Sequence, residues 1–429
     1  VSIPSTPCVL FIERIVFGHG SAGSFVLRET ITMNTNIRTL LAIALVTAIG
    51  LAGLDTTVAQ KDDKAKDTEP AAKPADKPAL DKATKSKAKK AIDNGIRYLV
   101  KQQEENGSYM NNVGVTALAV KAMAKSPRAY RAKSGPFMSD AIDYILKHQK
   151  PDGSIHDGHY ANYSTSLAVT ALVALDNPKY KDALEKAKEF LYGSQLDEGE
   201  GFKKAEHSSY GGIGYGSGQE PDMSNTQLWA DAMKALDLPK DDPAWDKVAV
   251  FATRCINDPE LNDLAEFQGL KAAVNTDGGA IYQPDNSAAG AETLPDGRKA
   301  WRSYGSMTYG TMKTLIYADI PRDDPRIESL MGWIRENYTL AENPGMGLQG
   351  LYYYYATIPK ALDAMETHAV TDSLGIEHNW RKELIEKLAD KQRDDGSWVN
   401  TNGRWWEDQP VLVTTYSILA LIEARDGVE

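Results

Sequence analysis

The sequence has 429 residues, 25% of them charged, and a formal net charge of −11. Proteins that bind nucleic acid need basic patches to neutralise phosphate, so this balance excludes nucleic acid as the main partner. Two cysteines occur, Cys8 and Cys255. We expect Cys8 to be absent from the mature protein. Cys255 then has no disulfide partner, and the core alone must hold the fold.

A secretory signal peptide is predicted over residues 33–59. Arg38 supplies a positive charge, residues 40–54 form an apolar run, and small residues follow as a cleavage site. This run is short for a membrane helix. The alternative is an uncleaved signal, which would be the protein's only membrane contact. We expect a periplasmic or extracellular protein whose true initiator is Met33, with residues 1–32 an upstream mistranslation.

Residues 60–87 are typical of a solvated linker. They consist mainly of Lys, Ala, Asp and Pro and have almost no apolar residue that would anchor a core. Residues 88–425 remain, and a chain of this length buries most of its apolar surface as one large domain. The sequence therefore predicts a single folded domain behind a disordered linker.

A short phrase, which we call the staple phrase, recurs along this domain: Gln, three residues, Gly, one residue and an apolar residue. Its good copies are residues 103–109, 149–155 and 392–398. A further copy begins at Gln195, with Gly199 as the glycine and Phe202 displaced by an insertion. Degenerate copies follow at Asn275 and Asn343. The glycine supplies a positive φ for a tight turn, so we interpret the phrase as structural rather than catalytic.

Each copy lies between two kinds of helical pattern. The segment before it has apolar residues spaced by three and four, as in residues 88–99, which is typical of an amphipathic surface helix. The segment after it is apolar or small all round, as in residues 411–422, which is typical of a helix buried on both sides. Six such pairs predict an all-α (α/α)6 toroid of six outer and six inner helices. An open solenoid is the alternative, but its ends would need polar repeats.

The phrase Q-x-x-x-G-x-W between helices resembles the repeat of squalene and oxidosqualene cyclases. The alternating double ring resembles the β-subunit of protein prenyltransferases. This resemblance to the terpenoid cyclase and prenyltransferase toroids covers residues 88–425 and implies their fold. The D-x-D-D run of the cyclases, whose central Asp protonates an alkene, is missing, as is the G-C-G-E-Q run of thioester proteins. Cys255 ends an outer helix, away from the cavity where prenyltransferases hold zinc, so we expect no metal site and no cofactor.

Inner helices that run parallel place their N-termini on one rim, where long loops supply aromatic and polar side chains. The candidate ligand contacts from these loops and the inner helices are His207, Tyr210, Trp301, Tyr304, Tyr353, Trp405 and Trp406. For Trp405 and Trp406 the alternative is packing of the last repeat against the first.

Three carboxylates, Asp222, Glu407 and Asp408, precede buried helices and are the candidate catalytic acids. Capping of a helix N-terminus is the alternative role for each of them. We predict an exported toroid that binds an apolar or amphiphilic small molecule, an isoprenoid or a glycan, in its central cavity. The alternatives are an isoprenoid cyclase or transferase with a rearranged acid, and a carbohydrate-active toroid enzyme with two carboxylates roughly 5–9.5 Å apart.

Overall fold

The computed structural model describes residues 80–216 and 219–427. The predicted signal peptide, the residues before it and most of the predicted linker lie outside the described residues. The first described helix begins at Lys82, so residues 82–87, which the sequence assigned to the linker, are helical. Asp81 starts this helix by accepting a hydrogen bond from the Thr84 backbone N–H at 2.8 Å.

Two sets of helices alternate along the chain. The outer helices are α2 (Lys82–Lys101), α4 (Pro136–Lys147), α6 (Lys181–Tyr192), α8 (Pro243–Arg254), α10 (Pro325–Asn337) and α12 (Trp380–Lys391). The inner helices are α3 (Val113–Lys125), α5 (Ala161–Ala174), α7 (Met223–Ala235), α9 (Gly305–Tyr317), α11 (Leu351–Ala364) and α13 (Pro410–Asp426). Two small antiparallel hairpins pair β1 (Ala291–Thr293) with β2 (Lys299–Trp301) and β3 (Val370–Thr371) with β4 (Glu377–His378). Single 3-10 turns occupy residues 132–134, 178–180, 198–200, 264–266 and 404–406.

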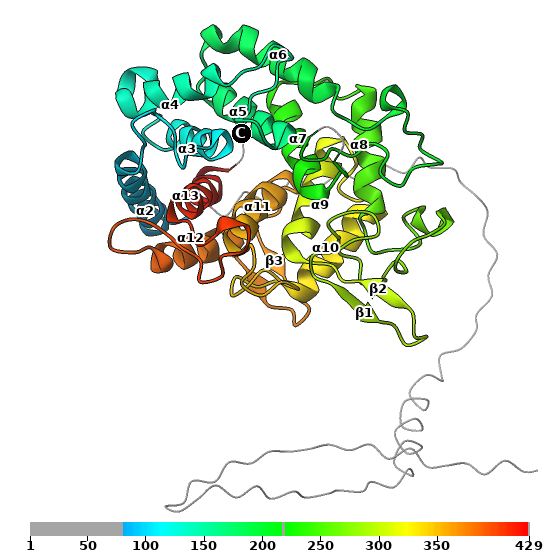
Figure 1. Cartoon of the computed structure of the whole chain (residues 1–429). Helices are drawn as coiled ribbons and strands as arrows, with labels where there is room; N and C mark the ends of the chain where they lie inside the picture. The colour runs from blue at the N-terminus through cyan, green and yellow to red at the C-terminus, as the bar shows by residue number, and fades with distance from the viewer. Residues whose placement is uncertain (1–79, 217–218, 428–429) are drawn as a thin grey trace, which may run out of the picture. The chain divides into compact units, whose positions relative to one another are not determined.

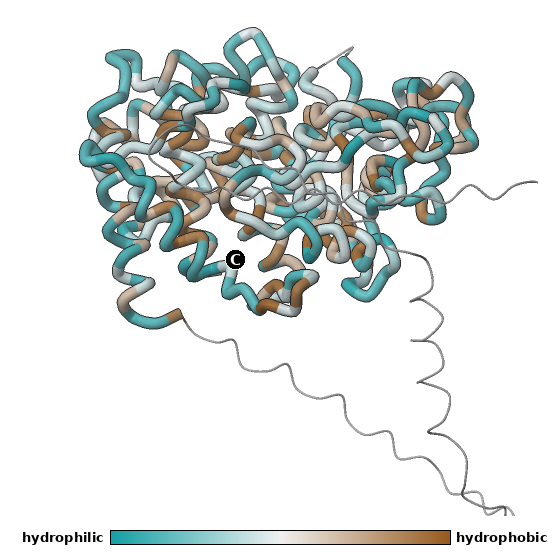
Figure 2. Tube along the Cα trace, turned by 90° about the horizontal axis from the view of Figure 1, so that it is seen from below, coloured by the Kyte–Doolittle hydropathy of each residue, from teal (hydrophilic) through white to brown (hydrophobic). Residues whose placement is uncertain are grey.

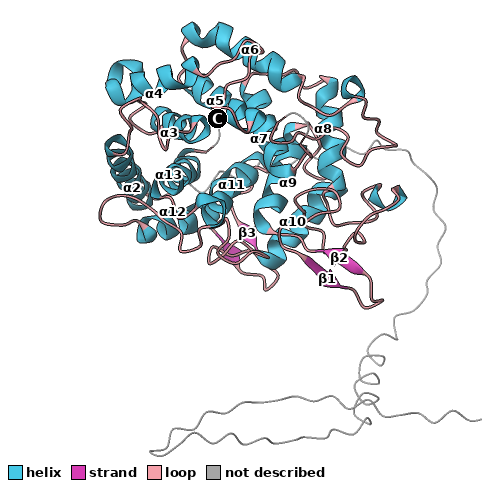
Figure 3. Ribbon diagram, in the orientation of Figure 1, coloured by secondary structure: helices cyan, strands magenta, loops and turns pink. Residues whose placement is uncertain are grey.

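The inner helices form a closed ring, which we call the inner barrel. Each of them packs against the next in the order α3, α5, α7, α9, α11 and α13, and α13 packs against α3. The outer helices surround this barrel, and α12 also packs against α2 (Figures 1 and 3). The prediction of an all-α toroid is confirmed, and the closure rules out the open solenoid.

The burial of each helix follows its sequence pattern. Every residue of α3 from Val113 to Ala124 is buried, whereas α6 buries only Ala187 and Leu191. Figure 2 shows hydrophobic and hydrophilic residues alternating along the helices. Each fully buried aliphatic side chain contributes about 1.5–3 kcal/mol, so the interface between the two layers is a major source of stability. Within the described part, no helix is long and apolar enough to cross a membrane.

The staple phrase makes the same contacts in repeat after repeat. The Gln149 side-chain amide donates to the carbonyl of Gly153, in its own turn, at 3.2 Å and to the carbonyl of Ala183, on the next outer helix, at 2.8 Å. The amides of Gln103, Gln195 and Gln392 each make the same two kinds of hydrogen bond. The phrase therefore joins each outer helix to its neighbour.

The glycine of the phrase is required by both space and backbone conformation. Gly153 has a φ of 91°, and a Cβ built on it would lie 2.2 Å from the Lys186 carbonyl oxygen. The residue two positions later, Ile155, is fully buried, and its backbone N–H donates to the Thr165 hydroxyl on an inner helix at 2.8 Å. The turn thus ties an outer helix to an inner one.

The copy of the staple phrase that begins at Gln195 uses a different glycine and a different buried residue from those predicted. Gln195 donates to the carbonyl of Gly211, which has a φ of 83° and lies against α8. The buried residue that follows is Ile213. Gly199 and Phe202, which the sequence placed in these roles, belong to an insertion that precedes Gly211.

Candidate functional site

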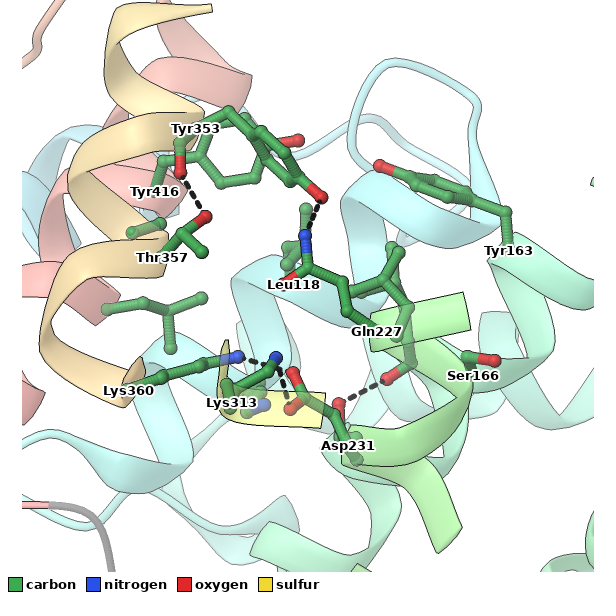
Figure 4. Close-up of a pocket in the computed structure, with 16 residues that line it drawn as sticks. Leu118, Tyr163, Ser166, Gln227, Asp231, Lys313, Tyr353, Thr357, Lys360 and Tyr416 are labelled. Atoms are coloured by element: carbon green, nitrogen blue, oxygen red, sulfur yellow. Dashed lines mark hydrogen bonds and ion pairs between the residues drawn. The ribbon is translucent and has the colours of Figure 1, made fainter. Parts of the chain in front are cut away.

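A cavity of about 40 Å³ lies inside the inner barrel, and all six inner helices contribute residues to its wall. Figure 4 shows tyrosines on one side of it and a lysine–aspartate cluster on the other. One buried water needs roughly 10–15 Å³ of such space, so the cavity holds a few waters or one small polar group. A ligand with an isoprenoid-sized body would therefore extend past the tyrosines.

Three tyrosines, Tyr163, Tyr353 and Tyr416, form what we call the aromatic tier. The Tyr353 hydroxyl accepts a hydrogen bond from the Gln227 side-chain amide at 2.6 Å and bonds the Ser224 hydroxyl at 2.8 Å. Its ring meets that of Tyr416 edge to face, with 5.9 Å between centroids. Burial raises the pKa of all three phenols, so they are neutral hydroxyls at physiological pH.

The aromatic tier continues to the protein surface. The Tyr215 ring lies 6.0 Å from Tyr163 and 5.0 Å from Tyr160, measured between centroids. Tyr160 is 49% exposed and has a left-handed backbone with a φ of 52°, a conformation that is rare for a bulky residue. Tyrosine rings therefore lead without a break from solvent to the cavity.

The opposite side of the cavity is what we call the charged tier, formed by Lys121, Asp231, Lys313 and Lys360. One Asp231 oxygen accepts from the Lys313 ammonium at 2.6 Å and the other from the Lys360 ammonium at 2.7 Å. Burial alone would raise the pKa of Asp231, but the lysines hold it below its usual value. Glu423, buried on α13, adds a second carboxylate within electrostatic reach of the three lysines.

Asp222 starts α7 and is a buried carboxyl group. It accepts hydrogen bonds from the Asn225 backbone N–H at 2.8 Å and the Asn225 side-chain amide at 2.7 Å. The hydroxyl of Tyr282 interacts with Asp222 and with Tyr215. Burial raises the pKa of Asp222 to about 7. A carboxyl group that is half-protonated at neutral pH is thus linked through Tyr282 to the aromatic tier.

The other two candidate acids are placed differently. Glu407 is buried and accepts hydrogen bonds from the backbone N–H groups of Tyr353 at 2.8 Å and Tyr352 at 3.2 Å, so it caps the N-terminus of α11. Burial raises its pKa. Asp408 is exposed. Glu407 therefore caps α11 and not α13, the helix that it precedes in the sequence, and catalysis by Glu407 and Asp408 stays a prediction.

The predicted ligand contacts do not form one site. Tyr353 lines the cavity, and Tyr304 is buried at the start of α9. His207, Tyr210 and Trp301 are not part of the cavity wall. They bond within their own loops: the His207 ring with the Lys203 backbone N–H, Tyr210 with Glu198, and Trp301 with Asp285.

The tryptophan pair lies in the loop before α13. Trp405 and Trp406 are about half exposed, at 47% and 53%, and both have left-handed backbones. The Arg404 guanidinium lies over the Trp405 ring, 4.4 Å from its centroid. A Cβ built on Gly350, at the start of α11, would lie 3.0 Å from the Trp405 ring. Ligand binding by this exposed pair stays a prediction.

The sequence did not lead us to the charged tier. It also did not lead us to two of the three tyrosines of the aromatic tier, Tyr163 and Tyr416. The available signal was a charge in the middle of otherwise apolar inner helices: Lys121 in α3, Asp231 in α7 and Lys313 in α9. A charge in such a helix needs a partner, because an isolated buried charge is costly. Among the described residues, no group of three His, Cys, Asp or Glu side chains is arranged to hold a metal ion.

No protein-family model and no curated protein matches the sequence. Solved structures with a similar fold include the type II terpene cyclase MstE from Scytonema, which is 12% identical with a TM-score of 0.48 over 80% of this chain and 99% of that one. An α-1,6-mannanase from Salegentibacter sp. is 11% identical with a TM-score of 0.49 over 79% of this chain and 98% of that one. Likeness at these levels concerns the fold alone, and the toroid assignment rests on the closed ring of this chain's own helices.

Proposed function

We propose that this toroid binds a small amphiphilic molecule, with the apolar body along the aromatic tier and one end inside the inner barrel. The observation that carries the proposal is the unbroken series of tyrosine rings from exposed Tyr160 to the cavity. Aromatic rings supply a large apolar contact area, and their hydroxyls bind a polar group at low entropic cost. We also propose that the protein works after export, in the periplasm or outside the cell.

Filling the cavity tests this proposal. Ala356 lines the cavity on α11, whereas Ala364, at the end of the same helix and equally half-buried, does not. We expect the full chain to bind 1-hexanol saturably in calorimetric titration, and Ala356→Phe to weaken binding by about tenfold or more, because a ring fills the space. Ala364→Phe is the matched control. Equal binding by both variants, or no saturable binding by the parent, would refute the proposal.

A second candidate is an isoprenoid cyclase in which Asp222 is the rearranged acid. The specific observation in its favour is the buried carboxyl with a pKa of about 7, linked through Tyr282 to the aromatic tier. A general acid works best when its pKa is near the operating pH. Squalene incubated with the full chain would then give a cyclic product by mass spectrometry. Asp222→Asn would abolish that product, and Asp242→Asn, at the start of outer helix α8, would not.

The carbohydrate-active alternative needs two free carboxylates that face one sugar. Asp222 and Glu407 are the buried carboxylates at the rim, and each is engaged by helix N–H groups. Such capping holds a carboxylate in place and competes with a role as nucleophile or base. We therefore propose the amphiphile-binding function ahead of glycan hydrolysis.

A further inference from the structure

Lys121 differs from the two other lysines of the charged tier. Lys313 and Lys360 share the Asp231 carboxylate. Lys121 lines the same cavity and is only 9% exposed, yet its ammonium makes no hydrogen bond or ion pair with any residue of the described ranges. A buried charge without a partner carries a large desolvation cost. The site therefore holds one cationic group that is aimed into the cavity and unused.

The charges around Lys121 do not balance. Asp231 on α7 and Glu423 on α13 supply two carboxylates, which face the ammonium groups of Lys121, Lys313 on α9 and Lys360 on α11. Three ammonium groups against two carboxylates leave one positive charge. Helix α5 contributes the hydroxyls of Ser166 and Thr170 to the wall, and Lys125 lies one turn further along α3. One bound monovalent anion would make this buried tier neutral.

We propose that the ligand carries a single carboxylate, that this group binds Lys121 inside the cavity, and that binding brings a proton onto the Lys121 amine. The proposal rests on the amphiphile-binding function above and names the chemistry of the buried end of the ligand. The carboxylate pairs with the unused ammonium, and Ser166 lies in the same cavity wall.

The protonation of Lys121 supports this coupling. Burial, and then the charge of Lys360, lowers the pKa of Lys121 to about 7, while Asp231 and Glu423 oppose the shift. Above pH 7 the amine of the free protein is therefore mostly neutral. An anion beside it favours the charged form and raises the pKa again. Binding above pH 7 must then take up a proton, and affinity must fall as the pH rises.

Charge and volume favour a carboxylate over a diphosphate. The cavity of about 40 Å³ accommodates one small planar group. A diphosphate carries several negative charges, of which the tier would neutralise only one, and the rest would be buried without partners. An amphiphile with a carboxylate end satisfies both limits, and its apolar body meets the tyrosines.

Calorimetric titration of the full chain with hexanoate tests the proposal, with 1-hexanol and inorganic pyrophosphate as comparison probes. Titrations in Tris and in HEPES, whose ionisation enthalpies differ, give the number of protons taken up. We expect hexanoate to bind about tenfold or more tightly than 1-hexanol near pH 6.5. We expect uptake of about one proton near pH 8.5, and roughly tenfold weaker binding for each pH unit above the pKa of Lys121.

Lys121→Met assigns the effect to this residue, because Met keeps the length of the side chain without the amine. We expect the variant to bind hexanoate no better than 1-hexanol and to take up no proton. The control is Lys234→Met, which removes an exposed lysine from inner helix α7. Burial also lowers the pKa of Lys313, to about 8, so proton uptake by the parent chain near pH 7.5, where Lys313 is still mostly charged, keeps the proposal testable if Lys121→Met folds poorly.

The outcomes separate this inference from the proposed function. Hexanoate binding without proton uptake near pH 8.5, or unchanged binding by folded Lys121→Met, overturns the role of Lys121. Equal binding of hexanoate and 1-hexanol overturns it as well and leaves the amphiphile-binding function standing. Tighter binding of pyrophosphate than of hexanoate overturns the choice of a carboxylate. If neither hexanoate nor 1-hexanol binds, both proposals fail.

Discussion

The turns between the helices and the wall of the inner barrel are built in opposite ways. In the turns, Gln103, Gln149, Gln195 and Gln392 repeat one set of hydrogen bonds around the ring. In the barrel, the residues that line the cavity differ from helix to helix, and the wall has tyrosines on one side and lysines with an aspartate on the other. Repetition is what a closed scaffold needs, whereas a ligand that is not six-fold symmetric needs different groups on each side. The difference supports the proposal that the barrel wall is the part of the molecule that binds a ligand.

The largest effect is expected from Asp231→Asn, in the barrel. This change leaves two buried ammonium groups, on Lys313 and Lys360, without their shared partner. We expect a loss of about 3–5 kcal/mol in the free energy of unfolding, measured by urea denaturation at pH 7. The control is Asp319→Asn, which breaks an exposed pair with Lys240 and should change little. Equal stability of the two variants would show that the charged tier does not hold the barrel.

The next effect is expected in the turns, from Gly396→Ala. Gly396 has a φ of 93°, and an added Cβ would lie 2.5 Å from the Asn94 carbonyl oxygen. We expect a loss of about 2–4 kcal/mol in the free energy of unfolding. Gly332, inside α10, has open space where its Cβ would be, so Gly332→Ala should leave stability unchanged or raise it. If both variants lose stability equally, the staple phrase does not hold neighbouring outer helices together in the way that its hydrogen bonds indicate.

A smaller effect of opposite sign is expected from Lys121→Met. The pKa of Lys121 is about 7 in the folded protein and is lowered from 10.5, so the parent carries a costly buried charge below pH 7 and loses this cost as the pH rises toward 10.5. We expect the variant to be more stable than the parent by about 1–3 kcal/mol near pH 6, with the difference shrinking above pH 7. Thermal unfolding of both proteins near pH 6 and near pH 10 measures this difference in stability. A variant that is less stable near pH 6 would show that the ammonium already has a partner.

The smallest effect is expected at the rim, from Asp222→Asn. Burial raises the pKa of Asp222 from 3.8 to about 7, so the parent loses stability as the pH rises between these values, while Asn keeps a capping oxygen. We expect the variant to gain about 1–2 kcal/mol over the parent between pH 4 and pH 7 and no more above that.

Asp324, at the start of α10, gives the contrasting result at an outer helix. Its hydrogen bond from Arg326 lowers its pKa. Asp324→Asn should therefore lose stability relative to the parent as the pH rises toward about 4, with a constant deficit above that, the opposite of Asp222→Asn. If the stabilities of the two variants, each relative to the parent, changed with pH in the same direction, the opposite pKa shifts of Asp222 and Asp324 would be contradicted.

The fold was predictable because its signals are local. Helix period and the staple phrase each depend on neighbouring residues, and they gave the alternation of outer and inner helices. The copy that begins at Gln195 was assigned the wrong glycine because an insertion separates Gln195 from Gly211. The order Gly211, Gly212, Ile213 repeats Gly153, Ser154, Ile155 and was the signal that would have corrected it.

The site was less predictable because it depends on how six helices are rotated. Asp222 and Tyr353 were found as a charge before a buried helix and as part of a tyrosine run. Helix period shows that Lys121 and Asp231 lie in buried helices, but not that both face the same cavity. That relation comes from packing between segments far apart in the chain, and no local pattern encodes it.

The most direct test of the ligand site is the pKa of Lys121, measured by NMR titration of the lysine side chains in the full chain, with Lys121→Met to assign the signal. We predict a pKa of about 7 in the free protein, because burial and Lys360 disfavour the charge. Saturating hexanoate should raise it by roughly one unit or more, since an anion beside the amine stabilises the ammonium. An ordinary lysine pKa in the free protein that hexanoate leaves unchanged would contradict the assignment of the barrel as an anion-binding ligand site.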